Sequence, residues 1–198
     1  MRKIAVVLSG CGHKEGTEIT EAVSTFICLS ELGVKYQCFA PENLMQDSAK
    51  ISRGEISDIK NLKTSDFDAV IFPGGFGAAT KLSDWAEKGA KCTVQPEVER
   101  VIREFNDQDK PIGAICIAPT LVARVLGSKN INLTIGNDAA TVAEIQKTGA
   151  QHANCPVNDY ISDRDHKILT TPAYMYDAQP NEVFTGIRKM IRELVEMA

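Results

Sequence analysis

The sequence predicts an α/β fold of three layers, in which helices cover both faces of a doubly wound, mostly parallel sheet. Short apolar runs and helical patterns alternate along the whole chain, which is the order that βαβ units produce. The apolar runs are also continuous rather than alternating, as is typical of strands buried on both faces. Small-residue turns follow several of these runs, at the strand ends where such folds place their functional loops.

The amino-terminal third follows this pattern most simply. Residues 4–8 form an apolar run that ends in a glycine-containing turn, and residues 17–32 carry apolar side chains on one helical stripe. Gly33 ends this helix, and residues 34–40 form the next strand. The chain therefore opens as strand, helix, strand. Residues 41–66 are polar and weakly periodic, and we expect a surface excursion, which could contain short strands of its own and is either functional or partly mobile.

The rest of the chain continues the alternation. Residues 67–72 form another apolar run before the turn at residues 73–79, and the run at 112–117 leads into a helix that Gly127 stops. The other predicted elements are helices at 85–89, 95–106, 139–148 and 181–197, a short strand at 132–135, and two strands at 159–162 and 167–170. No shift in composition divides the chain, so we expect residues 1–198 to form one domain.

Composition and charge argue against several classes of protein. The chain is 43% hydrophobic and 24% charged with a net charge of −4, and nothing in it favours binding to nucleic acid or to an anionic membrane. No apolar run reaches membrane-spanning length. The six cysteines include no Cys-x-x-Cys pair, so we expect no metal site, and no cofactor motif is complete. Because no secretory pattern opens the chain, we expect reduced thiols and a cytoplasmic protein.

Residues 111–121 read as a strand, a sharp turn and the start of a helix, with Cys116 at the turn. Such a turn lifts a nucleophile out of the packed sheet. The helix that begins at Pro119 directs its first N–H groups at the sulfur, and we expect it to lower the pKa of the thiol. The simpler alternative is a buried structural cysteine, because free cysteines are among the most buried residues.

Two further features follow the ends of predicted strands. Gly74 and Gly75 can present bare N–H groups to an oxyanion, although the same pair also suits a plain turn between strand and helix. Glu18 and Glu21 are three residues apart and share one face at the start of the first helix, where acidic residues ordinarily stabilise the helix end. Glu21 adjoins apolar residues, and burial beside Cys116 would raise its pKa.

Several motifs together resemble the ThiJ/PfpI superfamily, whose flavodoxin-like fold is that of the class I glutamine amidotransferases. The elbow AICIAP at residues 114–119 and the glycine turn PGGFGAA at 73–79 carry this resemblance. The motifs LSGCG at 8–12, GTEITEAV at 16–23 and TTPAYM at 170–175 are similar to the ElbB-like branch, also called sigma cross-reacting or enhancing-lycopene-biosynthesis protein. The resemblance runs from the first predicted strand to the last predicted helix.

The resemblance implies a site with a cysteine nucleophile, a carboxyl partner and backbone donors for an oxyanion. These are Cys116; Glu21, with Glu18 as the second candidate; and Gly75 and Ile117, with Gly74 and Gly10 in the substrate-binding loops. Peptidase-like members of the superfamily place a histidine directly after the cysteine, whereas this chain has Ile117 there. We therefore expect neither amide hydrolysis nor glutamine amidotransfer.

The same resemblance implies a cofactor-independent, glyoxalase-type enzyme that converts small aldehyde substrates, glyoxal or methylglyoxal, to 2-hydroxy acids. The superfamily also includes the parkinsonism-associated deglycase, so a deglycase-like activity is a related expectation, and a homodimer is expected from the superfamily as well. The alternative is a redox sensor or chaperone-like protein that uses oxidation of Cys116 and has no dedicated substrate.

Overall fold

The computed structural model describes residues 2–198 and contains a seven-stranded sheet in the order β3-β2-β1-β4-β5-β9-β8. Neighbouring strands are parallel, apart from β8 and β9, which pair antiparallel at one edge. This sheet confirms the three-layer, mostly parallel α/β fold predicted from the sequence. The strands are β1 (Lys3–Val7), β2 (Lys35–Ala40), β3 (Ser57–Asp58), β4 (Ala69–Phe72), β5 (Ile112–Ile115), β8 (Ile161–Asp163) and β9 (Ile168–Thr171).

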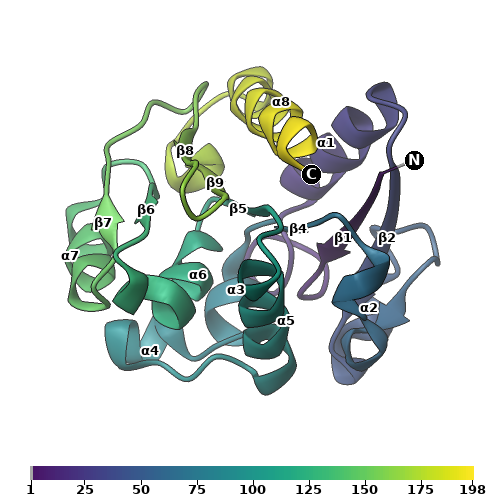
Figure 1. Cartoon of the computed structure of the whole chain (residues 1–198), viewed down its shortest axis with the longest axis horizontal. Helices are drawn as coiled ribbons and strands as arrows, with labels where there is room; N and C mark the ends of the chain where they lie inside the picture. The colour runs from purple at the N-terminus through teal and green to yellow at the C-terminus, as the bar shows by residue number, and fades with distance from the viewer. Residues whose placement is uncertain (1) are drawn as a thin grey trace.

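Helices cover both faces of this sheet (Figure 1). Helices α1 and α8 pack together on one face, and α3, α5 and α6 lie on the other. The helices are α1 (Ile19–Glu31), α2 (Met45–Ser48), α3 (Phe76–Thr80), α4 (Trp85–Lys88), α5 (Pro96–Asp107), α6 (Pro119–Leu126), α7 (Ala139–Lys147) and α8 (Pro180–Met197). Short 3-10 helices span Glu42–Leu44, Ile59–Asn61, Thr64–Asp66, Gly89–Lys91, Gly127–Lys129 and Ala173–Met175.

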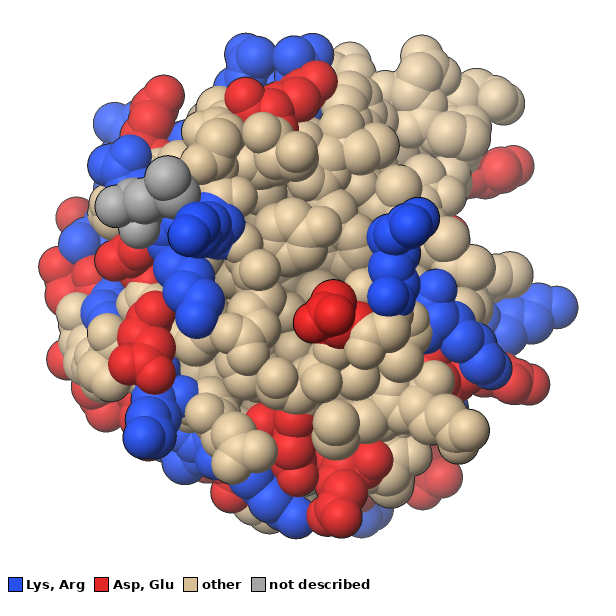
Figure 2. All heavy atoms as spheres, turned by 90° about the vertical axis from the view of Figure 1, so that its right-hand side faces the viewer, with Lys and Arg blue, Asp and Glu red and all other residues tan. Residues whose placement is uncertain are grey.

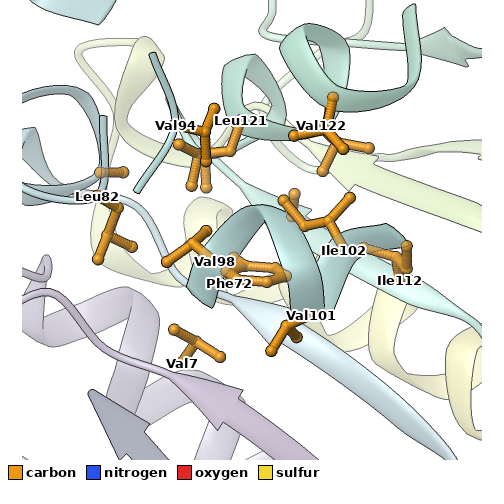
Figure 3. Packing of buried hydrophobic residues seen from close by; sticks show 14 of the residues in the cluster. Val7, Phe72, Leu82, Val94, Val98, Val101, Ile102, Ile112, Leu121 and Val122 are labelled. Atoms are coloured by element: carbon orange, nitrogen blue, oxygen red, sulfur yellow. The ribbon is translucent and has the colours of Figure 1, made fainter. Parts of the chain in front are cut away.

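The central strands send alternate side chains to two separate cores. In β1, Ile4 and Val6 join the core under α1 and α8, whereas Ala5 and Val7 join the core under α5 and α6. Figure 3 shows the second core, in which Val7 lies on the same side of the sheet as Phe72 of β4 and faces side chains of α5. Burial on both faces is the reason that these strands appear in the sequence as continuous apolar runs.

Sheet order determines where the functional loops meet. Strands β1, β4, β5 and β9 are successive neighbours and run parallel, so their carboxyl ends share one edge of the sheet. The loops that follow them are the first loop (residues 8–18), the glycine turn, the Cys116 elbow and the turn at residues 172–175. Open α/β sheets bind their ligands at this edge.

Two regions differ from the prediction. Residues 41–66 contain the short strand β3, which pairs with the end of β2 and agrees with an excursion that holds short strands, but they also form α2 and short 3-10 helices, which were not expected. A second small sheet joins β6 (Asn132–Leu133) to β7 (Gln151–His152) in parallel, and β7 was not predicted because two residues carry no readable period.

Among residues 2–198, no helix combines the length and apolar character that crossing a bilayer requires.

Candidate active site

Cys116 occupies the sharp turn between β5 and α6. Its φ of 62° is a left-handed conformation that costs a non-glycine residue on the order of 1–3 kcal/mol. Its N–H donates to the carbonyl oxygen of Thr171 at 2.9 Å, which holds the turn against the end of β9. The residue is 7% exposed, so the turn keeps the thiol inside the protein rather than lifting it clear of the sheet as expected.

Glu21 is the partner of this thiol and lies completely buried in the first turn of α1. Its carboxyl group forms a hydrogen bond with the Cys116 thiol. Oε2 accepts the N–H of Gly74 at 2.9 Å, and Oε1 accepts the N–H of Tyr174 at 3.4 Å. Loops that follow β4 and β9 therefore orient the carboxyl group toward the elbow.

Burial controls the protonation of this pair. It raises the pKa of Glu21 to about 8, and the nearby charge of Glu18 acts in the same direction. Burial and the Glu21 carboxyl group also raise the pKa of the Cys116 thiol. The expected lowering by the helix is therefore wrong, because desolvation outweighs the neighbouring N–H groups. At neutral pH the Glu21 carboxyl group and the Cys116 thiol are both protonated. Because the two groups interact, the first proton to be lost belongs to the pair and not to one residue alone.

The backbone N–H groups of Gly75 and Ile117 lie near the sulfur of Cys116, where they oppose the rise in the pKa of its thiol. Gly75 has a φ of 94° and approaches the first loop so closely that a Cβ would lie 2.3 Å from the carbonyl oxygen of Gly16. A Cβ on Gly74 would lie 2.5 Å from the Cβ of Cys116. Glycine is required at both positions by close packing, and the glycine turn and the elbow form one compact unit.

Two of the predicted site residues have other roles. The Glu18 carboxylate caps α1 by accepting the N–H of Glu21 at 2.7 Å, and the Glu18 N–H donates to the carbonyl of Gly74 at 3.0 Å. Of the two glutamates, Glu21 is thus the one that contacts the thiol. The N–H of Gly10 donates to Ser48 Oγ at 2.9 Å, so this N–H is already engaged and is not available to a substrate.

Sequence reasoning missed the residues that hold the loops in place. Asp47 of α2 accepts the N–H of Cys11 at 2.8 Å, so the 41–66 segment fastens the first loop to the rest of the molecule. Ala173 has a φ of 43°, and this strained turn leads directly to the Tyr174 N–H that binds Glu21. In the sequence, Asp47 looks like any surface aspartate, and an alanine such as Ala173 gives no indication of a left-handed backbone conformation.

The three histidines have other partners or lie at the surface. His152 Nε2 accepts the N–H of Ile135 at 3.1 Å, the ring of His166 pairs with Asp163, and His13 is exposed. Within residues 2–198, no histidine forms a hydrogen bond with the thiol or with its carboxyl partner. Among the titratable side chains, Glu21 is the one whose carboxyl group acts on the pKa of the thiol.

Two curated relatives cover almost the whole chain. Human "Glutamine amidotransferase-like class 1 domain-containing protein 3, mitochondrial" is 39% identical over 224 residues, covering 98% of this chain and 83% of the relative. The rat "ES1 protein homolog, mitochondrial" is 37% identical, covering 98% and 84%. Both are mitochondrial by name, and this contradicts the cytoplasmic location expected above. The expectation rested on reduced thiols, and reduced thiols do not separate the cytosol from an organelle.

Solved structures extend the comparison. An isoprenoid biosynthesis protein with an amidotransferase-like domain from Ehrlichia chaffeensis is 32% identical, with a TM-score of 0.93 over 100% of this chain and 99% of that one. Glyoxalase III from Candida albicans shares the fold, with a TM-score of 0.69 at 13% identity over 99% and 97% of the two chains. The DJ-1/PfpI family matches residues 3–171, which confirms the resemblance seen in the motifs. The chain belongs to the DJ-1/PfpI family.

Proposed function

We propose that the protein is a cofactor-independent, glyoxalase-type enzyme that converts 2-oxoaldehydes such as glyoxal and methylglyoxal, with water, to 2-hydroxy acids. The observation that carries this proposal is the buried Cys116–Glu21 pair, with two N–H donors at the sulfur and no histidine partner. The reaction needs one nucleophile and one group that moves a proton between adjacent carbons. The fold shared with a glyoxalase III is compatible with this chemistry, but at 13% identity it shows the fold alone.

In the proposed reaction, Cys116 Sγ bonds to the aldehyde carbon, and the thiol proton passes through Glu21 to the carbonyl oxygen, giving a hemithioacetal. The N–H groups of Gly75 and Ile117 stabilise the charge that develops on this oxygen. Glu21 then takes the proton from the first carbon and returns it to the second, and the hydroxyl proton moves from the oxygen on the first carbon to the oxygen on the second. The first carbon is thereby oxidised to a thioester while the second is reduced to an alcohol. Water hydrolyses the thioester, which restores the thiol and releases the 2-hydroxy acid.

The direct test is the product. Wild-type protein is incubated with methylglyoxal in buffer free of glutathione and other small thiols, and lactate and remaining aldehyde are both measured. We expect lactate to appear in the same molar amount as the aldehyde consumed. Loss of aldehyde without lactate would indicate adducts with lysine, arginine and cysteine side chains, and would contradict the proposal.

The redox-sensor alternative has less support. Peroxide oxidises exposed cysteines of low pKa most readily, whereas Cys116 is buried and burial raises its pKa. Selective oxidation of Cys116 by mild peroxide, with the other five cysteines spared, would favour the sensor. Uniform oxidation of all six would count against it.

The raised pKa of the pair predicts how activity depends on pH. The reactive form has lost one proton, and the pKa of Glu21 is about 8. We expect kcat/KM for methylglyoxal to rise about tenfold per pH unit below pH 8 and to level off above it, because kcat/KM reports ionisation of the free enzyme. Initial rates between pH 6 and pH 9.5, at roughly constant ionic strength, check this. A profile that is flat, or that falls through pH 8, would contradict it.

We also propose a homodimer formed through the outward face of α1. Ile19, Val23 and Ile27 are spaced four residues apart and are 47%, 39% and 45% exposed. The charged residues of α1 are Glu21, which is buried, and Glu31 at the helix end, so the outward face is uncharged along most of its length. Figure 2 shows the side of the molecule that carries β2, where broad uncharged areas are interrupted by a few acidic and basic side chains. A second copy offers the same uncharged surface, which suits a twofold contact.

Light scattering tests the dimer. We expect a mass of about 43 kDa, twice the 21.6 kDa of one chain. The variant Ile27→Lys places a charge in the proposed contact two turns away from Glu21, and we expect it to shift the mass toward 21.6 kDa. A wild-type mass of 21.6 kDa would show that α1 does not mediate a dimer in solution.

A further inference from the structure

We propose that a cleft beside the elbow binds an apolar substituent of the substrate, so that the preferred 2-oxoaldehydes carry an aryl or larger alkyl group in place of the methyl group of methylglyoxal. This inference rests on the proposed function and specifies its substrate class. The cleft lies between α3, α4 and α7 and has a volume of about 510 Å³. In Figure 1, α4 and α7 are neighbours at the lower left, below and beside the elbow that leads into α6.

The position of the cleft links it to the reacting sulfur. Phe76 and Ile117 both line it. Phe76 directly follows Gly75, and Ile117 directly follows Cys116, so each is the neighbour of a residue that contacts the sulfur or carries it. Adjacent Cα atoms are about 3.8 Å apart. Cys116 itself is not part of the cleft wall, so the cleft adjoins the elbow and the glycine turn through these two residues. A substituent on a carbon that is bonded to Cys116 would reach the cleft by passing Phe76 or Ile117.

Apolar side chains make up the part of the cleft wall that adjoins the elbow and the glycine turn. Ala79, Trp85 and Ala140 contribute to the wall together with Phe76 and Ile117. Phe76 is 56% exposed, the highest value among the large hydrophobic side chains that are exposed in residues 2–198. An exposed phenylalanine next to a reacting group is explained by an apolar ligand that covers it.

Two of the three charged side chains that line the cleft are engaged with other protein groups. Lys88 pairs with Asp84, and Glu144 pairs with Lys147 and accepts the N–H of Ala90 at 2.9 Å. The third, Glu87, is exposed and forms no ion pair among residues 2–198. An anionic substituent would lose its water beside this carboxylate without gaining a partner, whereas an apolar one would gain burial against Phe76 and Ile117.

The size of the cleft points the same way. A water molecule occupies about 30 Å³ in the liquid. The 510 Å³ of the cleft is therefore many times larger than the volume of a hydrogen atom or a methyl group. Glyoxal and methylglyoxal would leave most of this space to water. A phenyl ring attached to the ketone carbon would cover Phe76 and approach Trp85.

Occupancy is tested without turnover, because Trp85 is the single tryptophan of the chain and lines the cleft. In Cys116→Ser, we expect benzyl alcohol to change Trp85 fluorescence in a saturable way and ethanol not to. Ala140→Phe should abolish the saturable change by filling the cleft, whereas Ala139→Phe should retain it. Both alanines are exposed at the start of α7, and of these two Ala140 alone lines the cleft. The same response in both variants would overturn the proposed site.

Selectivity is tested with wild type and the same two variants that add a phenylalanine. We expect wild type to have a higher kcat/KM for phenylglyoxal than for methylglyoxal by about tenfold or more. Ala140→Phe should lower the phenylglyoxal value by about tenfold and change the methylglyoxal value less than about twofold, and Ala139→Phe should change neither. Equal values for the two substrates would overturn this inference and leave the proposed function intact. If wild type converts neither aldehyde, the proposed function fails, and Trp85 fluorescence still decides whether the cleft binds apolar groups.

Discussion

Replacing Glu21 with glutamine is expected to abolish most turnover while stabilising the folded protein at alkaline pH. Glutamine can accept the N–H of Gly74 and donate to the sulfur, as the protonated carboxyl group does, but it cannot take up a proton from carbon. Loss of a general acid–base group typically costs about 10²–10⁴ in rate. We therefore expect lactate formation from methylglyoxal to fall by about that factor, with the circular dichroism spectrum unchanged.

The stability effect of the same variant follows from linkage. The pKa of Glu21 is about 8 in the folded protein and near the ordinary 4.5 when unfolded. Between these values the folded state binds the additional proton, so the free energy of unfolding of wild type decreases as pH rises from 4.5 to 8. Glu21→Gln has no proton to lose at this position, so its free energy of unfolding lacks this decrease with pH. Each unit by which the pKa is raised corresponds to about 1.4 kcal/mol in the free energy of unfolding.

Urea titrations at several pH values between 5 and 8 measure the difference. We expect Glu21→Gln to gain several kcal/mol over wild type across this interval, with the gap widening as pH rises. Glu182→Gln is a control, because Glu182 is an acidic residue in the first turn of a different helix, α8. Parallel curves for wild type and Glu21→Gln would show that Glu21 is ionised in the folded state at neutral pH, which would contradict its raised pKa and the pH profile of activity expected from it.

Replacing Gly74 with alanine is expected to damage both the fold and the site. The added Cβ would lie 2.5 Å from the Cβ of Cys116, 2.7 Å from Glu21 Oε2 and 2.8 Å from the carbonyl oxygen of Ile115. These atoms belong to the backbone or to short, buried side chains, so they have little room to move. We expect a loss of about 3 kcal/mol in stability from overpacking, and loss of turnover below detection.

Gly54→Ala is the matched control for this variant. Gly54 has a φ of 90° and no atom within 4 Å of an added Cβ, so its substitution costs only backbone strain of about 1–2 kcal/mol. Activity should survive in Gly54→Ala. If Gly74→Ala were as active as Gly54→Ala, the thiol, the carboxyl group and the glycine turn would not be packed as tightly as described.

Much of this arrangement could be predicted because it depends on local pattern. Continuous apolar runs revealed the buried parallel strands, and glycines after strand ends marked the close approach of loops, as Gly74 and Gly75 show. Cys116 and Glu21 were identified through motif resemblance, and the sheet order then explains how residues 95 positions apart meet at one edge.

The rest depends on packing that the sequence does not display. Whether the thiol pKa rises or falls is decided by how completely the loops close over Cys116, and the helix start alone suggested the wrong direction. Glu18 caps the start of α1, whereas Glu21 is buried one turn into the helix, and their spacing in the sequence does not show which of them reaches the thiol. Asp47 acts on the first loop across a separation of 36 residues, and a polar segment gives no sign of such a contact.

The measurement that tests the central claim most directly is lactate formation from methylglyoxal by wild type, Cys116→Ser and Cys11→Ser in thiol-free buffer. Cys11 is more exposed than Cys116, so its thiol is the better target for simple aldehyde adducts. We expect Cys11→Ser to match wild type and Cys116→Ser to produce no lactate above the rate without protein. Equal lactate formation by Cys116→Ser and wild type would contradict catalysis by the Cys116–Glu21 pair.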